Sequence, residues 1–224
     1  ELTGAGFSVT PHKAMFPDIA KSLKLKVESR LPAIRITDLL LEVDARTEFS
    51  NAFTHLRSGR TADNKLALLT AILADGINLG LTRMADVSPG ITMRQLAWAH
   101  DWHIREEGYT AAHAILVNAQ RQLPLASLWG DGTTSSSDGQ YFPAGGHAEA
   151  IGDLNGRYGP NPGAKFYRFT SDQYGAFYII AMNANASEAI YVLDGLLYHG
   201  SDLAIETHYV DTGGVSDMSF ALCH

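Results

Sequence analysis

The sequence predicts a mixed α+β or α/β chain with a mainly helical first half and a sheet in the second half. Apolar residues recur at helical spacing up to about residue 124. After that point, short runs rich in aromatic and β-branched residues alternate with connections rich in glycine and proline. A chain of 224 residues with 46% hydrophobic residues can build a substantial core. We therefore expect a helical region over residues 1–124 and a sheet-bearing region over residues 125–224.

The helical half begins with a stretch that the pattern leaves open, because residues 21–26 suit a short strand or a loose helix. A helix is then predicted to start near Thr37, with apolar residues grouped on one side. The clearest helix is expected to begin at Thr61 and to run to residue 77 or as far as residue 81. It is apolar nearly all round, which indicates burial, and Gly76 and Gly80 within it suggest close contact with another backbone.

Two further helices are expected before residue 124. Thr92 can cap the first, which passes Trp98 and Trp102 and ends at Gly108. Because the two tryptophans lie four residues apart, we expect them on one helix face in the core. The second helix is expected to start at Thr110 and to end before Pro124.

The second half of the sequence is predicted to form four strands and two helices. Residues 133–142 form the first strand, and the small hydroxyl side chains of Ser135, Ser136 and Ser137 indicate that something approaches its backbone closely. Residues 166–169 and 176–181 read as a hairpin. A helix capped by Ser187, a strand over residues 205–210 and the start of a helix near residue 216 follow.

The candidate site residues are an aspartate of the first strand, Asp138 or Asp131, and Asp211 near the end of the fourth. Each is placed on a strand beside glycine, and two strands from distant parts of a chain can bring such carboxylates to one edge of a sheet. Mg²⁺ prefers oxygen ligands from one or two carboxylates together with phosphates. Asp131 is the alternative to Asp138 as the metal-binding acid of the first strand. However, Asp131 and Gly132 suit a turn that leads into that strand. The simpler interpretations are a hairpin turn for Asp138 and a helix cap for Asp211.

Composition limits the other functions. The formal net charge of −7 argues against nucleic-acid binding, which usually shows as a basic patch, although Arg83, Arg94 and Arg121 could contact phosphates if they are more than solvated surface. No nucleotide-binding loop or zinc-ligand spacing is present. With one cysteine, no apparent signal peptide and no long apolar span, we expect a cytoplasmic protein that does not enter a membrane.

The motifs in this order resemble those of one transposase family. Three antiparallel strands, a crossover helix and a fourth strand are similar to the first part of a ribonuclease-H-like fold. The motifs WGDGTTSSSDGQ (129–140), SDQY (171–174), YVLDGLLYH (191–199), HYVDTGG (208–214) and ADGINLGL (74–81) resemble the transposases of the Tn3 family of bacterial replicative transposons.

That resemblance implies a DNA-cleaving and strand-transferring enzyme with an Asp-Asp-Glu triad and Mg²⁺ or Mn²⁺ as cofactor. Asp138 would be the first acid and Asp211 the second, while the Glu is expected beyond His224. The chain would then be an internal piece of a transposase, without activity of its own, whose partners are transposon ends, target DNA and a second transposase subunit. The alternative is a non-catalytic module that binds DNA or protein and whose carboxylates are structural.

Overall fold

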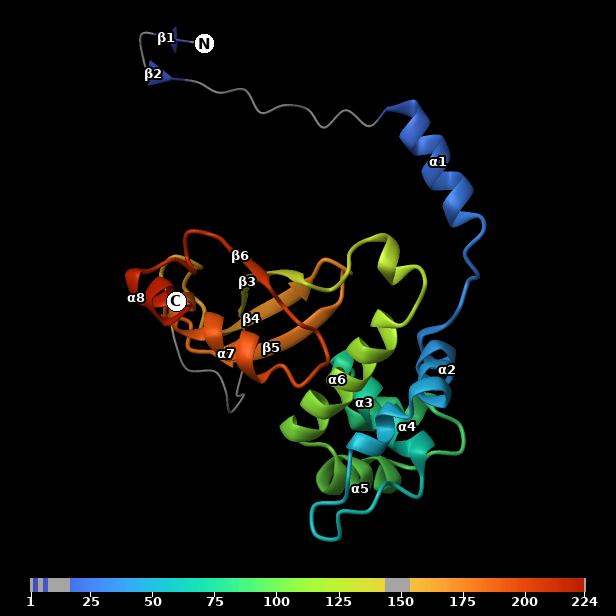
Figure 1. Cartoon of the computed structure of the whole chain (residues 1–224). Coiled ribbons are helices and arrows are strands. Elements are labelled where there is room, and N and C mark those ends of the chain that lie inside the picture. Colours follow the sequence, from blue (N-terminus) through green and yellow to red (C-terminus); the bar gives the residue numbers. More distant parts are fainter. Residues whose placement is uncertain (1, 4–5, 8–16, 144–153, 224) are drawn as a thin grey trace. The chain divides into compact units, whose positions relative to one another are not determined.

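The computed structural model describes residues 2–3, 6–7, 17–143 and 154–223, and these form two compact units, Glu1–Leu39 and Leu40–His224 (Figure 1). The first unit holds a short antiparallel pair, β1 (Leu2–Thr3) and β2 (Gly6–Phe7), and the helix α1 (Asp18–Glu28), none of whose residues is buried. The open choice over residues 21–26 is thus settled as helix. Within the described part of the chain, no helix has the length and apolar character needed to cross a membrane.

The helical part of the second unit packs around one apolar cluster. Phe53, Leu68 and Leu96 are its most completely buried large side chains. Helix α3 contacts both α4 and α5, and α6 contacts the short 3₁₀ helix η1. The elements are α2 (Ile36–Thr47), of which the residues from Leu40 onward belong to this unit, η1 (Phe49–Ala52), α3 (Lys65–Gly76), α4 (Leu81–Val87), α5 (Met93–His103) and α6 (Glu106–Arg121).

Helix α3 is shorter than its apolar pattern suggests. It ends at Gly76, Asn78 and Gly80 both have positive φ, and α4 begins at Leu81. A Cβ on Gly76 or Gly80 would meet no atom within 4 Å, so the expected close backbone contact is wrong. Gly80 is needed instead for its φ of 78°, which side chains of L-residues rarely adopt.

Two expectations about the next helices are also wrong. Gly108 does not end a helix but lies in the first turn of α6, where a Cβ would come within 2.9 Å of Phe53 Cδ1. Trp98 is 56% exposed, so it is not a core residue, although it lies on α5 as expected. The Thr92 cap is confirmed, because its hydroxyl accepts from Gln95 N and the Gln95 side chain bonds back to Thr92 N.

The second half contains a four-stranded mixed sheet in the order β5–β4–β3–β6. Strands β3, β4 and β5 pair antiparallel, and β6 lies parallel to β3 after a connection through α7. The chain is therefore α+β, with its helices mostly in the first half. The elements are η2 (Ala126–Leu128), β3 (Thr134–Pro143), β4 (Gly163–Ser171), β5 (Ala176–Met182), η3 (Glu188–Tyr191), α7 (Val192–Tyr198), β6 (Thr207–Val210) and α8 (Asp217–Cys223).

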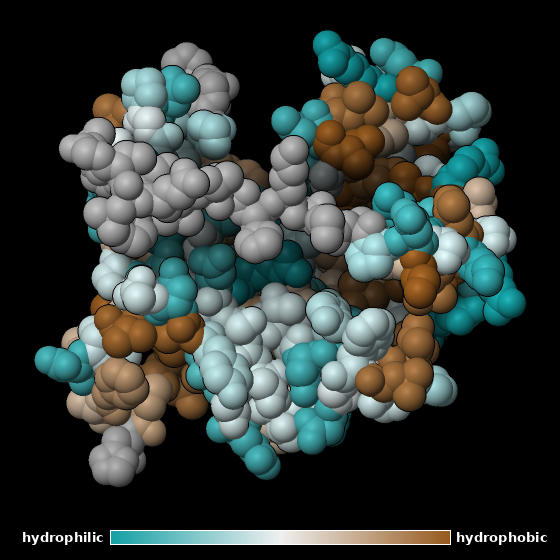
Figure 2. All heavy atoms as spheres, turned by 90° about the horizontal axis from the view of Figure 1, so that it is seen from above, coloured by the Kyte–Doolittle hydropathy of each residue, from teal (hydrophilic) through white to brown (hydrophobic). Residues whose placement is uncertain are grey.

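A second apolar cluster covers one face of this sheet and centres on Tyr167, Phe169 and Phe177. Helices α6 and α7 both contact β5. Helix α6 serves both clusters, with Ala112 in the first and Val117 in the second. The division expected near residue 124 remains a prediction. Figure 2 shows hydrophobic side chains exposed in separate groups among hydrophilic ones on the face that it presents.

Candidate metal-binding carboxylates at the strand ends

Strands β3 and β6 bring the two candidate acids to the same place. Their parallel register pairs Thr134 with Thr207 and ends with Ser137 opposite Val210. Asp138 continues β3, and Asp211 is the first residue after β6, so both follow the last pair in register. Both are exposed, and both line one pocket of about 500 Å³. The structure therefore brings together two residues that are 73 positions apart in the sequence.

The pocket combines acidic, basic and amide side chains with exposed backbone. Besides the two aspartates, it is lined by residues of β4, of η3 and of the segments on either side of the strands. These are Gly139, Asn155, Arg157, Tyr158, Lys165, Ala184, Asn185, Ala186, Ser187, Glu188, Thr212 and Gly213. A polar hollow with two exposed carboxylates suits a hydrated cation better than an apolar ligand.

The Asp211 carboxylate is oriented by the backbone that follows it. Its Oδ1 accepts hydrogen bonds from Gly213 N at 2.8 Å and Gly214 N at 3.3 Å. Among the described residues, neither Asp211 Oδ2 nor the Asp138 carboxylate has a hydrogen-bond or ion-pair partner. One oxygen of Asp211 therefore shapes the turn, and three carboxylate oxygens of the pair face no protein donor in the described chain.

Asp131, the rival first acid, lies in the turn that enters β3. Its Oδ1 accepts from both the backbone N and the hydroxyl of Thr133, at 3.0 and 2.7 Å. The hydrogen bond from the Thr133 hydroxyl and that from its backbone N–H lower the pKa of Asp131. Gly132 has a φ of 84°, and Asp131 does not line the pocket. Its geometry is that of a turn residue.

On the face of β3 opposite to Asp138, the buried Ser135 and Ser137 form a polar network with the partly buried His208. His208 places Nδ1 2.7 Å from Ser135 Oγ and Nε2 2.8 Å from Ser137 Oγ, and Ser137 Oγ lies 2.6 Å from the Tyr167 hydroxyl. The imidazole also stacks on Phe169 with ring centroids 5.4 Å apart. Small hydroxyl side chains on β3 therefore leave room for an imidazole, which is the close approach that the serine run predicts.

Burial shifts the titration of this network. It lowers the pKa of His208, which favours the neutral ring that both serines contact. Burial also raises the pKa of Tyr167 to about 12; the Ser137 hydrogen bond opposes this, and the negative charges of Glu188, Asp211 and Asp138 add to it. The three carboxylates are thus close enough for Tyr167 to be influenced by all of them.

Glu188 is a residue of this pocket that sequence reasoning missed. It starts η3, is 7% exposed, and forms a buried ion pair with Lys165 of β4. Its other oxygen, Oε2, is buried without a partner among the described residues. A Cβ on Gly139 would meet Glu188 Oε1, and one on Gly213 would lie 3.3 Å from Glu188 Oε2. The glycine after Asp138 and the first glycine after Asp211 therefore leave space for this carboxylate.

The sequence of β4 contains an indication of the ion pair between Lys165 and Glu188. Lys165 occupies a position of the alternating pattern whose next members, Tyr167 and Phe169, are buried. A lysine on the buried face of a strand needs a carboxylate partner, because an unpaired buried ammonium is costly. The sequence could therefore have predicted a buried acid, although not which one.

The donor set fits a hard cation only in part. In the portion of the chain that the structure describes, no three His, Cys, Asp or Glu side chains are grouped so as to hold a metal ion. Asp138 and Asp211 would supply two carboxylates, and Mg²⁺ commonly keeps water and substrate phosphate oxygens as its other ligands. Histidine side chains can also bind metal ions. Of these, His199 does not line the pocket, and His147 lies outside the described residues.

Comparison with known proteins identifies the family. The family described as the Tn3 transposase DDE domain matches residues 38–224. The chain is 53% identical over 223 residues to the transposase for transposon Tn501 of Pseudomonas aeruginosa, with all of this chain and 23% of that protein covered. It is 51% identical to the transposase for transposon Tn3926 of Escherichia coli, with 99% of this chain and 22% of that protein covered.

A third relative has a similar sequence identity and similar coverage of both chains. The transposase for transposon Tn21 of Escherichia coli is 51% identical over 223 residues, covering all of this chain and 23% of that protein. The chain thus spans about a quarter of the length of these relatives. With a family match over most of its residues and identities above one half, the chain belongs to the Tn3 transposase DDE domain family.

Proposed function

We propose that this chain supplies two metal-binding carboxylates, Asp138 and Asp211, to a transposase that cuts and joins DNA during replicative transposition. The observation that carries the proposal is the parallel register of β3 and β6, in which the two acids follow the last pair and line one pocket. The order of three antiparallel strands, a helix and a parallel fourth strand supports a ribonuclease-H-like sheet.

In this proposal, Asp138 and Asp211 hold Mg²⁺ or Mn²⁺ through oxygen atoms. Such ions activate an attacking water or DNA 3′-hydroxyl and stabilise the leaving oxygen. Gly213 N and Gly214 N fix the orientation of the Asp211 carboxylate through their hydrogen bonds to Oδ1. Arg157, which is exposed in the same pocket, offers a guanidinium to a DNA phosphate.

Glu188 and Lys165 have a positioning role in this proposal. Their buried ion pair lies against Gly139, directly after Asp138, and Glu188 Oε2 lies close to the position of Gly213. A rigid pair at this position limits how the ends of β3 and β6 can move. The pair therefore supports the separation of the two exposed acids rather than binding DNA itself.

The remaining parts of the reaction come from outside this chain. The relatives are named transposases and are about four times as long. We infer that the third acid is a Glu elsewhere in the transposase, that the 224-residue chain alone does not transfer strands, and that a dimer in the bacterial cytoplasm acts on transposon ends and target DNA.

A second candidate function has one observation in its favour. Asp211 Oδ1 already accepts two backbone hydrogen bonds, as an aspartate does when its only role is to shape a turn. In that case the two acids are structural, and the chain serves as a non-catalytic DNA- or protein-binding module. The two functions differ in whether Asp138 and Asp211 bind a cation together.

A titration with Mn²⁺ tests this difference. We expect saturable binding that broadens the amide NMR signals around both Asp138 and Asp211, because Mn²⁺ is paramagnetic. Asp138→Asn and Asp211→Asn should each weaken binding by about tenfold or more, a change of about 1.4 kcal/mol. Asp131→Asn is the matched control, since Asp131 belongs to the same segment but lies outside the pocket.

Two results would decide against a metal site formed by Asp138 and Asp211. Weak and scattered broadening that is the same in all four proteins would favour structural carboxylates. Loss of binding in Asp131→Asn alone would move the first acid to Asp131. In the full-length transposase, Asp138→Asn and Asp211→Asn should abolish strand transfer while leaving binding to transposon ends intact.

A further inference from the structure

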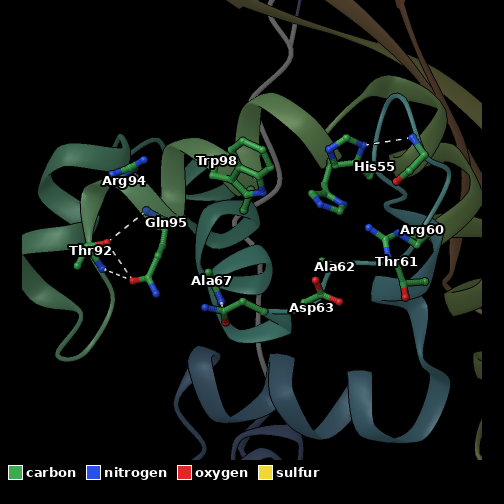
Figure 3. A pocket seen from close by; sticks show the side chains of 14 residues that line it. His55, Arg60, Thr61, Ala62, Asp63, Ala67, Thr92, Arg94, Gln95 and Trp98 are labelled. Carbon is green, nitrogen blue, oxygen red and sulfur yellow. Dashed lines mark hydrogen bonds between the residues drawn. The ribbon is translucent and has the colours of Figure 1, made fainter.

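The helical part of the second unit contains a second hollow that the proposed chemistry does not use. It has a volume of about 530 Å³ and lies between the start of α3, the face of α5 and the segment of residues 55–64 (Figure 3). Its volume falls in the range of small-molecule sites. Its lining includes an exposed tryptophan, Trp98, and two arginines, Arg60 and Arg94.

One wall of the hollow is aromatic. Arg94, Trp98 and Trp102 follow one another at intervals of four residues on α5, so they lie along one helix face. The rings of Trp98 and Trp102 are 5.4 Å apart, and His55 stacks on Trp102 at 5.1 Å with an interplanar angle of 6°. Trp102 is thus covered, whereas Trp98 is 56% exposed. His55 also lies 6.1 Å from the Trp98 ring at a tilt of 42°, so the exposed part of the Trp98 ring is what a flat partner could contact.

Two arginine side chains line the hollow together with the Trp98 ring. Arg60 and Arg94 line the hollow and lie to either side of Trp98 in the view of Figure 3. Within the described chain, neither guanidinium has a hydrogen-bond or ion-pair partner. Arg57 lies over Trp102, with its guanidinium carbon 5.2 Å from the ring centroid. Asp63 is the acid in the lining, so the arginines outnumber it.

We propose that this hollow binds one unpaired nucleotide of DNA, with the base stacked on Trp98 and the flanking phosphates contacted by Arg60 and Arg94. Stacking on an aromatic side chain together with basic groups along the backbone is how proteins hold single-stranded DNA. A base inside a duplex cannot present its face to an indole, so the ligand is a single-stranded or extruded nucleotide. The choice of DNA rests on the proposed function, but the site shares no residue with the carboxylate pocket.

The first test measures the binding of a fluorescent single-stranded 15-mer to the 224-residue chain in EDTA, so that no divalent ion contributes. We expect the single strand to bind more tightly than the same sequence as a duplex. Trp98→Ala should weaken binding by about fivefold to a hundredfold, the range measured for loss of one base-stacking contact. Trp98→Phe should keep most of the affinity, and Arg94→Ala should reduce the salt dependence by about 0.7 in the log–log slope.

Two matched controls use exposed residues elsewhere. Trp129 is 60% exposed and packs against Tyr174, so Trp129→Ala removes an exposed indole that does not line this hollow. Arg83 on α4 is exposed and serves as the control for Arg94. Circular dichroism of each variant checks that the helices are intact. Equal binding by the Trp98→Ala and Trp129→Ala variants, or equal binding of single strand and duplex, would overturn the proposal.

The second test locates the contact in the full-length transposase. A single strand carrying 5-iododeoxyuridine is crosslinked by light to the aromatic ring on which the modified base stacks, and mass spectrometry identifies the peptide. We expect the crosslink at Trp98, and a crosslink only at other positions would overturn the site. Asp138→Asn separates the two proposals, because it should weaken metal binding by about tenfold or more and leave this crosslink unchanged.

Discussion

The two hollows of the second unit have nearly the same volume and opposite chemistry. The hollow between the helices, about 530 Å³, presents Arg60, Arg94 and the face of Trp98. The hollow at the strand ends, about 500 Å³, contains three acids, Asp138, Asp211 and Glu188, and two bases, Arg157 and Lys165, so acids outnumber bases there. A net charge of −7 therefore describes neither surface, because it averages regions of opposite sign. Total charge is a poor guide to whether such a chain meets DNA.

The two hollows also differ in how their charges are supported. Arg60 and Arg94 are exposed, so their removal should affect binding and leave stability nearly unchanged. The carboxylate pocket rests on the buried pair of Lys165 and Glu188, with side chains only 8% and 9% exposed. Substitutions of Lys165 or Glu188 should therefore mainly lower the free energy of unfolding. The predictions below test this contrast.

The largest effect is expected from Lys165→Met. This change leaves the Glu188 carboxylate buried without its cation, and breaking a buried ion pair costs about 3–5 kcal/mol. Urea denaturation measures the free energy of unfolding. Arg94→Met in the other hollow is the matched control and should change it by no more than about 0.5 kcal/mol.

The double variant Lys165→Met with Glu188→Leu separates lost charge pairing from lost packing. It should recover much of the stability, because removing both partners removes the unpaired charge. If Lys165→Met is as stable as the parent chain, the pair does not hold the strand ends in place.

An intermediate effect is expected from two glycine substitutions. In Gly139→Ala, the new methyl group would meet Glu188 Oε1 and lie 2.5 Å from Lys165 Cε, so the buried pair must shift, at about 1–3 kcal/mol. Gly76→Ala on α3 meets open space and should stabilise the chain by about 0.4–1 kcal/mol. Thermal unfolding of both variants gives the comparison, and changes of the same sign would contradict it.

The smallest effect is a dependence on pH. Burial lowers the pKa of His208, so the stability that its neutral form provides is complete above the unfolded value of about 6.5. That stability is lost as the pH falls from there toward the folded pKa, because the unfolded state then binds more protons. The melting temperature should be lower at pH 5.5 than at pH 7.5, and less so in His208→Gln. An unchanged slope in the variant would assign the effect to other groups.

The sheet was predictable because its signals are local. Alternation and turn residues located β3, the β4–β5 hairpin and β6 to within a few residues. The sequence also suggested that two carboxylates borne on distant strands, Asp138 and Asp211, could meet at one edge of the sheet, and both follow the last β3–β6 pair and line one pocket. Their role as metal ligands remains a prediction.

The sequence-based predictions were wrong or incomplete where contacts between distant segments determine the local structure. Gly108 resembled a helix end, but it is inside α6 because Phe53 leaves no room for a side chain. Trp98 resembled a core residue by its spacing, yet it contacts only the rings of His55 and Trp102 among the described aromatic contacts and stays 56% exposed. Glu188 carried no motif at all, since its importance depends on Lys165 of a different strand. Such contacts between distant segments leave no periodic trace in one sequence.

The hydrogen bonds of His208 have a consequence for protein engineering. A slip of one residue between β3 and β6 would turn Asp211 to the other face and separate it from Asp138. His208 resists that slip, because its ring nitrogens contact Ser135 and Ser137 at the same time. Grafting the two acids onto a different sheet would therefore require the two serines and the histidine as well, since these three residues set the alignment of the strands.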